Sequence, residues 1–184
     1  MAFFNYTPSF LESQKNNHIG LFYDSNDEKN NISANFIEKG LEKNKKCIYI
    51  TSGKNIKKIS SALYKNRCRP QKFQDKNQLE FNRARDTYLQ NGTFQIANMI
   101  KIITDSLNRA KKEGFSGLRG LAEMNWILEK NISLSKIKKY ETRLNKILKD
   151  KDITLLCQYK FKKFPPQFIK NMVLIHPYVI HTRM

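Results

Sequence analysis

The sequence predicts a three-layer α/β protein, in which a mostly parallel sheet is flanked by helices. Short apolar runs alternate along the chain with segments whose apolar residues recur every three or four positions. The connections between them are short, as is typical of strands and helices that alternate around a parallel sheet. The length of 184 residues suits a single domain. We expect this domain over residues 16–184, after a polar lead-in over residues 1–15.

The first part of the chain alternates strand and helix. The run HIGLFYD ends in a polar turn, where Ser25, followed by Asp27 and Glu28, has the character of a helix N-cap. In order, the expected elements are a strand over 18–24, a helix over 27–43, a strand over 47–51, a turn at Ser52–Gly53 and a helix through Ile56, Ile59 and Leu63.

The second part begins with a less regular stretch, residues 67–94, and then resumes the alternation. The expected elements are a strand over 79–81, a turn at Asn91–Gly92, a helix over 95–112 ended by Gly114, a strand over 118–124, a helix over 134–148 opened by Ser133, a strand over 153–159, a helix from Pro165 to about 174 and an extended segment over 176–180. No repeat, linker or second domain is predicted.

The net charge of +18 is large but not localised. Residues 1–50 carry no net charge, and the excess is spread over the rest of the chain, with far more Lys than Arg. A dedicated nucleic-acid site usually shows a sharper, Arg-rich basic stripe. Binding of nucleic acid is therefore an alternative and not the favoured role, although such a surface attracts polyanions at low salt.

Cysteine usage and hydropathy favour a cytoplasmic protein. Cys47, Cys68 and Cys157 lie far apart, and only three histidines accompany them, so neither a zinc finger nor a disulfide framework is expected. A sparse, odd set of cysteines suits a reducing compartment. No run of 18 apolar residues and no signal-peptide pattern is found, so we expect no membrane association.

Ligands of parallel α/β sheets bind beyond the carboxyl ends of the strands. The expected strand ends are Tyr23–Asp24, Thr51–Ser52, Glu123–Trp126 and Tyr159–Lys160. We therefore place a small, partly apolar ligand near Tyr23, Glu123, Trp126 and Tyr159.

The turn after the first strand is where a phosphate-binding loop would lie. Such a loop needs glycines for close approach of the backbone, a Lys for charge and a Ser or Thr for Mg²⁺. Lys29 occupies the lysine position, but Tyr23 and Glu28 stand at the glycine positions and Asn30 replaces the hydroxyl residue. The acidic neighbours would also repel phosphate. We predict a degenerate P-loop without ATP hydrolysis.

Glu123, late in its predicted strand, is a candidate pocket carboxylate. It could pair with Arg119 or a ligand, or it could be a structural acid in a salt bridge, and the sequence favours neither. Arg119 and Glu123 share one face of the strand but lie about 13 Å apart along it, so a direct pair is not required.

Trp126, the single Trp, either lines a pocket or packs beside the core, and we favour packing beside the core.

The other polar candidates have structural explanations. Tyr140 lies on the apolar face of its predicted helix, and Glu141 beside it is expected to be a solvated acid. Cys157 has no basic neighbour in the sequence and is expected to be a buried, inert thiol. His18 and His176 border extended segments and are expected to form structural hydrogen bonds. No catalytic triad, acid pair or metal constellation is found, so the sequence predicts no catalytic residue and no metal site.

A series of short motifs follows in order along nearly the whole chain, over about residues 16–182. They are His18…Leu21-Phe-Tyr23, Asn35-Phe-Ile-Glu-Lys-Gly40-Leu, Cys47-Ile-Tyr-Ile-Thr51, Tyr88-Leu-Gln-Asn-Gly92-Thr-Phe, Leu118-Arg119…Glu123-Met-Asn-Trp126, Tyr140-Glu141…Asn145, Leu156-Cys157-Gln-Tyr159 and His176-Pro177-Tyr-Val-Ile180. Together they resemble the MEDS domain, the methanogen/methylotroph, DcmR sensory domain.

The resemblance implies a RecA/KaiC-related domain without a working P-loop, in agreement with the turn at residues 23–30. It also implies a sensory, ligand-binding module of archaeal and bacterial signalling proteins. By analogy with the dichloromethane-responsive repressor of methylotrophs, its ligands would be small hydrocarbon derivatives. The predicted ligand site combines Asp24, at the first strand end, with the matching family positions. These positions are His18, Tyr23, Arg119, Glu123, Trp126, Tyr140, Glu141, Tyr159 and His176.

We therefore expect a stand-alone sensory protein and not an enzyme. It would use no cofactor, bind a small molecule and report through a partner protein, because sensory domains are normally fused to an output module. Two alternatives remain: a degenerate KaiC-like nucleotide-binding protein without hydrolysis, and a basic, nucleic-acid-binding transcriptional regulator.

Overall fold

The computed structural model describes residues 2–4, 17–51, 55–89 and 92–182. Within these residues, seven strands form one sheet. All neighbouring strands are parallel, in the spatial order β1-β7-β2-β6-β5-β3-β4. The strands are β1 (Ala2–Phe4), β2 (His18–Tyr23), β3 (Lys46–Thr51), β4 (Leu79–Arg83), β5 (Leu118–Glu123), β6 (Ile153–Lys160) and β7 (Tyr178–His181).

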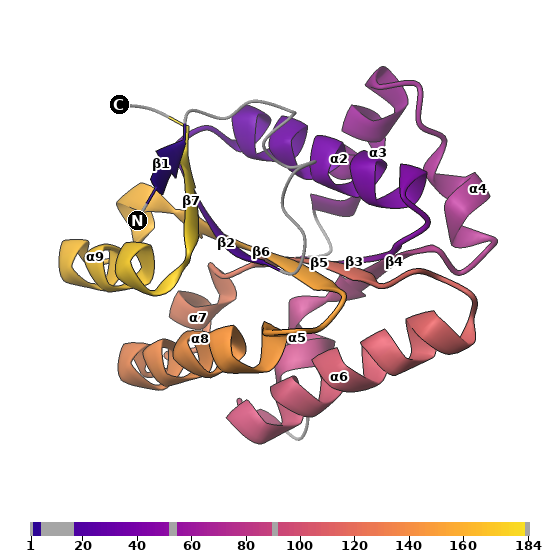
Figure 1. Cartoon of the computed structure of the whole chain (residues 1–184). Helices are drawn as coiled ribbons and strands as arrows, with labels where there is room; N and C mark the ends of the chain where they lie inside the picture. The colour runs from indigo at the N-terminus through magenta and orange to yellow at the C-terminus, as the bar shows by residue number, and fades with distance from the viewer. Residues whose placement is uncertain (1, 5–16, 52–54, 90–91, 183–184) are drawn as a thin grey trace.

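Helices cover both faces of the sheet, which confirms the predicted three-layer α/β class (Figure 1). One layer contains α2 (Asn26–Glu42), α3 (Ile56–Lys65) and α4 (Pro70–Gln74). The other contains α5 (Ala84–Tyr88), α6 (Ile96–Lys112), α7 (Trp126–Glu129), α8 (Leu134–Leu148) and α9 (Pro166–Ile175), and the short 3₁₀ helix η3 (Phe161–Lys163) follows β6. Among the described residues, no helix is both long and apolar enough to cross a membrane.

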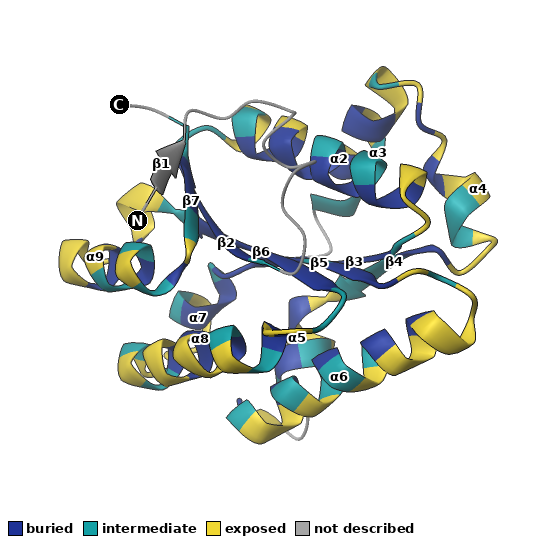
Figure 2. Ribbon diagram, in the orientation of Figure 1, coloured by how far each residue is buried: buried dark blue, intermediate teal, exposed yellow. Residues whose placement is uncertain are grey.

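The sheet separates two apolar cores. Successive side chains of a strand point to opposite faces, so Leu121 of β5 packs toward α2 whereas Ala122 packs toward α6 and α8. Figure 2 shows the result: the helix surfaces that face the sheet are buried, and their outer surfaces are exposed. Gly40 lets α2 approach the sheet closely, because a Cβ there would lie only 2.5 Å from Cys47 Sγ and 2.8 Å from Arg119 Cδ.

Some elements differ from those predicted. Strand β1 lies within the expected lead-in and pairs with β7, and the short helices α4, α5 and α7 lie where no helix was expected. Gly114 has a φ of 86° at the end of α6, as its predicted role requires. The Ser52–Gly53 turn, Asn91 and residues 5–15 of the lead-in lie outside the described residues.

Candidate functional site

Most of the residues predicted to bind a ligand fall into two groups, one at the carboxyl ends of the strands and one in the core beneath α8. His18 and Tyr23 show why: both belong to β2, but they are five positions apart and so point to opposite sides. Tyr23 lies with Glu123 and Trp126 around a cavity at the carboxyl ends of the strands. His18 lies with Glu141, Tyr159 and His176 beneath α8, so Tyr159 is not part of the cavity.

Glu123, the last residue of β5, is held by side chains from three other elements. Lys29 Nζ from α2 donates to Glu123 Oε1 in a buried ion pair. Thr51 Oγ1 donates to Oε2 at 2.6 Å, and Asn55 Nδ2 lies 2.8 Å and 2.9 Å from the two oxygens. The Tyr49 hydroxyl lies 3.0 Å from Oε1. Glu123 is thus a salt-bridged acid, and its cation is Lys29.

These contacts determine the ionisation of Glu123. Burial by itself would raise the pKa of the Glu123 carboxyl, but the charge of Lys29 and the hydrogen bonds from Lys29, Thr51 and Asn55 outweigh burial and hold that pKa below its usual value. The carboxylate is therefore ionised at neutral pH.

The first βα turn is occupied by the chain itself. The Ser25 hydroxyl accepts hydrogen bonds from the backbone N–H groups of Asp27 and Glu28, at 3.2 Å and 3.5 Å. These are the groups that would otherwise face a phosphate at the start of a helix. Lys29 is directed into the protein toward Glu123 and is only 1% exposed. The geometry agrees with a degenerate P-loop in which the lysine has a structural partner.

A cavity of about 590 Å³ lies beyond the strand ends, beside Glu123. Its basic, acidic, amide, hydroxyl and apolar lining consists of Tyr23, Asn26, Thr51, Asn55, Arg83, Ala84, Arg85, Leu89, Glu123, Asn125, Trp126, Glu129, Lys130, Lys160 and Lys163. Five of these side chains are basic and two are acidic, and one of the two acids, Glu123, is already paired with Lys29. The cavity therefore favours a negatively charged occupant.

Tyr23 and Trp126 are the buried aromatic residues of the cavity wall. Asn125 Nδ2 donates to the Tyr23 hydroxyl at 2.9 Å, and burial raises the pKa of Tyr23 to about 12. Trp126 stacks on Tyr88 with ring centroids 4.4 Å apart and lies against Phe94 at 5.5 Å. Trp126 thus combines the expected core packing with a place in the pocket wall.

Three other predicted site residues lie outside the cavity lining. Arg119 is buried, donates to the Phe36 carbonyl at 2.9 Å and lies 4.7 Å from the centre of the Phe36 ring. Tyr140 contacts Phe94 edge-on and borders an apolar void of about 50 Å³ on the far side of the sheet. The backbone N–H of Asp24 donates to Thr182 Oγ1 at 3.4 Å.

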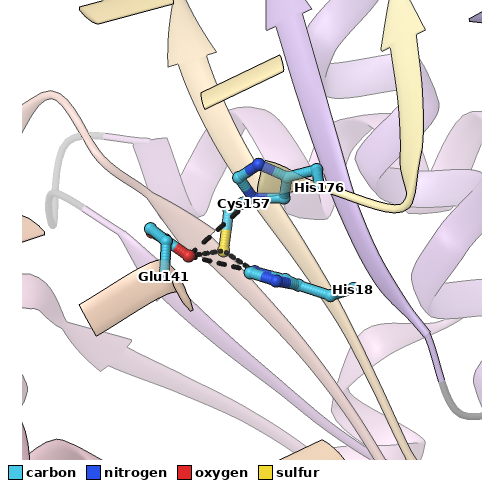
Figure 3. Close-up of side chains that lie close together, drawn as sticks. All are labelled: His18, Glu141, Cys157 and His176. Atoms are coloured by element: carbon cyan, nitrogen blue, oxygen red, sulfur yellow. Dashed lines mark hydrogen bonds and ion pairs between the residues drawn. The ribbon is translucent and has the colours of Figure 1, made fainter. Parts of the chain in front are cut away.

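The second group converges in the core beneath α8 (Figure 3). His18 Nε2 lies 3.0 Å from Glu141 Oε2 and 3.4 Å from Cys157 Sγ. Glu141 Oε2 lies 3.7 Å from Cys157 Sγ and 3.8 Å from His176 Nε2. The Tyr159 hydroxyl donates to the other oxygen, Glu141 Oε1, at 2.6 Å. All of these side chains are buried.

This geometry corrects two expectations. Glu141 was predicted to be solvated but is 0% exposed, because its partners come from the sheet and from the end of α9 and not from its own helix. Cys157 is buried as predicted, but it does have a histidine beside it in space. His18 and His176 do form structural hydrogen bonds: His18 Nδ1 bonds Asn145 Oδ1, and His176 Nδ1 bonds the Met172 carbonyl.

The ionisation of this group follows from its burial and its charges. Burial would raise the pKa of the Glu141 carboxyl, but the hydrogen bond and charge of His18 outweigh it and lower that pKa. Burial and the charge of Glu141 raise the pKa of the Cys157 thiol. Burial, together with the neighbouring His18, lowers the pKa of His176 to about 3 although Glu141 opposes this, so His176 is neutral at physiological pH.

Sequence reasoning did not connect several of these partners with the two glutamates, although Lys29 was singled out as a P-loop lysine, Thr51 as a strand end and Asn145 as part of a family motif. Lys29, Thr51 and Asn55 around Glu123 come from elements far from it in the chain, and no spacing rule links them to it. Asn145 is different, because it lies four positions after Glu141 and four positions define one face of a helix. The spacing Glu141…Asn145 was the signal that could have placed Asn145 beside the cluster.

Comparison with known proteins adds two findings. A family model described as MEthanogen/methylotroph, DcmR Sensory domain (MEDS) matches residues 17–177. Among solved structures, the chain is similar to a KaiC-like protein from the hyperthermophilic archaeon Pyrococcus horikoshii OT3, with a TM-score of 0.64, 15% sequence identity, and coverage of 90% of this chain and 71% of that chain. At this identity the likeness concerns the fold alone. No curated protein sequence matches the chain.

Proposed function

Because the chain belongs to the MEDS family of sensory domains, we propose that it senses a short-chain organic acid, an oxidised hydrocarbon derivative, and reports this to a partner protein. The observation that carries the proposal is the charge of the strand-end cavity. Arg83, Lys160 and three further basic residues line it, whereas its buried acid Glu123 is neutralised by Lys29. Lys160 is half-buried and the other four basic residues are exposed, so they form a positively charged rim that attracts an anion.

The cavity also suits the organic part of such a ligand. Leu89, Ala84 and Trp126 provide apolar surface among the polar groups, and small-molecule sites typically combine such surface with a few placed polar groups. The indole N–H of Trp126 is buried and has no hydrogen-bond partner within the described part of the chain. An oxygen of a ligand is one acceptor that could satisfy it.

The first βα turn supports small-molecule sensing over nucleotide hydrolysis. A hydrolase of this type needs a lysine and free backbone N–H groups to hold the phosphates. Here Lys29 is committed to Glu123, and the Ser25 hydroxyl occupies two N–H groups of the turn. Binding of an anion would therefore depend on the basic residues across the cavity and not on the first turn.

A sensor reports only when its ligand binds one conformation better than another. The cavity is lined by the ends of five strands, among them β4 with Arg83 and β6 with Lys160, and by residues of α2, α5, α7 and η3, so that an occupant would contact several separate elements. We infer that an anion drawing Arg83 and Lys160 together would shift the relative positions of these elements, and that the partner recognises the shifted form.

The first test is native mass spectrometry of untagged, gently purified protein, followed by calorimetric titration with acetate, glycolate and succinate. The corresponding amides serve as uncharged probes. We expect saturable binding of at least one acid, no binding of its amide, and at least about tenfold weaker binding in Lys160→Gln and Arg83→Gln, which corresponds to about 1.4 kcal/mol. Lys138→Gln, an exposed lysine of α8 that is not part of the cavity lining, is the matched control and should bind normally.

Two results would contradict the proposal. One is a clean mass without ligand together with no saturable binding of any acid. The other is saturable binding of ATP–Mg²⁺ that is lost in Lys29→Ala, which would support the nucleotide-binding alternative.

A further inference from the structure

We propose that His18, Glu141, Cys157 and His176 form a buried, four-coordinate binding site for a divalent transition-metal ion, with Zn²⁺ as the ion. The four side chains come from β2, α8, β6 and the residue that follows α9, and they point toward one another (Figure 3). Each offers one ligand atom, and these atoms all lie within 4.8 Å of one another. The site lies in the core beneath α8, shares no residue with the lining of the strand-end cavity, and is independent of the proposed sensory ligand.

The separations suit a tetrahedral ion. Zinc bonds to nitrogen, oxygen and sulfur of about 2.0–2.3 Å place the ligand atoms roughly 3.3–3.7 Å apart in a tetrahedron. The measured separations that involve His18 Nε2, Glu141 Oε2, Cys157 Sγ and His176 Nε2 include 3.0, 3.4, 3.7 and 3.8 Å. The two other separations, from His176 Nε2 to His18 Nε2 and to Cys157 Sγ, are at most 4.8 Å, so an ion would draw His176 toward these two ligands.

Both histidines are oriented as metal ligands usually are. A metal-binding histidine typically donates its other N–H to a carbonyl or carboxylate, which fixes the tautomer and the ring orientation. His176 Nδ1 lies 2.7 Å from the Met172 carbonyl, and His18 Nδ1 lies 2.8 Å from Asn145 Oδ1. The Asn145 amide is itself fixed, because its Nδ2 donates to the Ile175 carbonyl at 2.7 Å. In their neutral forms, both rings therefore direct the Nε2 lone pair into the cluster.

Without an ion, the cluster contains more acceptors than donors. Glu141 Oε2 can accept from the Cys157 thiol and from a proton on His18 Nε2, and neither of these donors reaches His176 Nε2. His176 Nε2 is buried and lacks a hydrogen-bond partner among the described residues. Buried polar atoms without partners are costly and need an explanation. A cation at the centre satisfies all four ligand atoms at once.

The charges also balance. The carboxylate of Glu141 and the thiolate of Cys157 carry two negative charges, which equal the charge of the ion, and the two imidazoles are neutral. Binding forms a metal–sulfur bond and releases the thiol proton to solvent, with no change of oxidation state. The Tyr159 hydroxyl donates to Glu141 Oε1 and so leaves Oε2 for the ion.

The ligand set and the burial indicate a structural ion. Nitrogen, oxygen and sulfur donors together suit Zn²⁺, whereas oxygen-only sites suit Mg²⁺ and Ca²⁺. Catalytic zinc sites keep one position open for water or substrate, whereas structural sites are closed by four protein ligands. All four ligands here are buried, so we infer a closed site that ties β2, β6, α8 and the end of α9 together.

The test uses untagged protein from zinc-supplemented cells, purified without chelators and analysed for metals by mass spectrometry. We expect about one zinc per chain. Cys157→Ala and His176→Gln should retain at least about tenfold less zinc. Cys47→Ala is the matched control, because Cys47 is an equally buried thiol on the other face of the sheet, and it should retain zinc fully.

A second measurement does not depend on the folding of any variant. Wild-type protein refolded with Co²⁺ should show the intense visible bands of tetrahedral cobalt and a sulfur-to-cobalt charge-transfer band in the near ultraviolet. Two outcomes would establish a hydrogen-bonded cluster instead of a metal site. In one, the purified wild-type protein contains no metal and shows no cobalt bands after refolding with Co²⁺. In the other, Cys157→Ala retains as much metal as Cys47→Ala. Iron or copper with the same dependence on the variants would overturn the assignment to zinc.

Discussion

Two buried glutamates on opposite faces of one sheet are stabilised in different ways. Glu123 has a lysine as its counter-ion, and both of its oxygens accept hydrogen bonds from neutral donors. Glu141 accepts from the Tyr159 hydroxyl at one oxygen and from the Cys157 thiol at the other, and this second oxygen also faces two histidines. The first arrangement is completed by the chain itself, whereas the second has a surplus of acceptors that only protons or a cation can balance.

The comparison also explains where an anion could bind. In a phosphate-binding loop the lysine of the first βα turn is available to the ligand. Here the charge of Lys29 is paired with Glu123. The positive charge at the strand ends therefore comes from residues across the cavity such as Arg83 and Lys160. The lysine at this position of the chain is buried and paired with a carboxylate of the protein itself.

The largest expected effect is obtained by breaking the pair on the first face. Lys29→Met leaves the buried carboxylate of Glu123 without its cation, and removing one partner of a buried pair typically costs about 3–5 kcal/mol of unfolding free energy. Lys29→Met combined with Glu123→Gln should recover a large part of this loss, because no uncompensated charge remains. Urea unfolding monitored by circular dichroism measures both.

Lys39→Met is the control for this experiment. Lys39 lies in the same helix, but its pair with Glu42 is on the surface, where such pairs contribute about 0–1 kcal/mol. If Lys29→Met were no more destabilising than Lys39→Met, the Lys29–Glu123 pair would not be the element that completes this site.

A smaller effect is expected from pH. The pKa of Glu123 is lower in the folded protein than in the unfolded chain, where it is about 4.3. The carboxylate therefore contributes stability that is fully present above the unfolded value and is lost as the pH falls through the folded value. The charged and titratable groups around it are Lys29 on α2, Tyr49 on β3 and Tyr23 on β2.

Chemical unfolding between pH 6 and pH 3 measures this contribution. We expect Glu123→Gln to be less stable than the wild type at neutral pH. It should lose stability less steeply in the acidic part of the range, because it has no carboxyl to protonate at this position. Parallel curves for the two proteins would show that Glu123 does not contribute to acid sensitivity.

Most of the fold was predictable because its elements are long and periodic. In α6, for example, Met99, Ile103, Leu107 and Ala110 recur at helical spacing and are all buried. The helices α4, α5 and α7 have four or five residues, which is about one turn and too short for any periodicity to show. Strand β1 has three residues and exists by pairing with β7, which is a tertiary effect.

The candidate site was predictable only where sheet geometry determines it. Tyr23, Glu123 and Trp126 were expected together because they follow parallel strands whose carboxyl ends share one edge. Glu141 was assigned to solvent because glutamate is almost never buried without a partner. Its partners His18 and His176 lie at opposite ends of the chain, and no local pattern connects them to α8.

The smallest expected effect concerns how the covering helix on each face begins. Ser25 opens α2 and accepts two backbone hydrogen bonds, whereas Ser133 opens α8 with no capping bond from its side chain and contacts Ser135 Oγ at 2.8 Å. Loss of a capping side chain typically costs about 1 kcal/mol, so Ser25→Ala should lower the unfolding free energy by about that amount. Ser133→Ala should cost clearly less, because it removes no cap. Thermal and urea unfolding of the two variants measures this difference. Equal losses of unfolding free energy would mean that the Ser25 hydroxyl does not cap the first turn of α2, and that it does not occupy the N–H groups a phosphate would need.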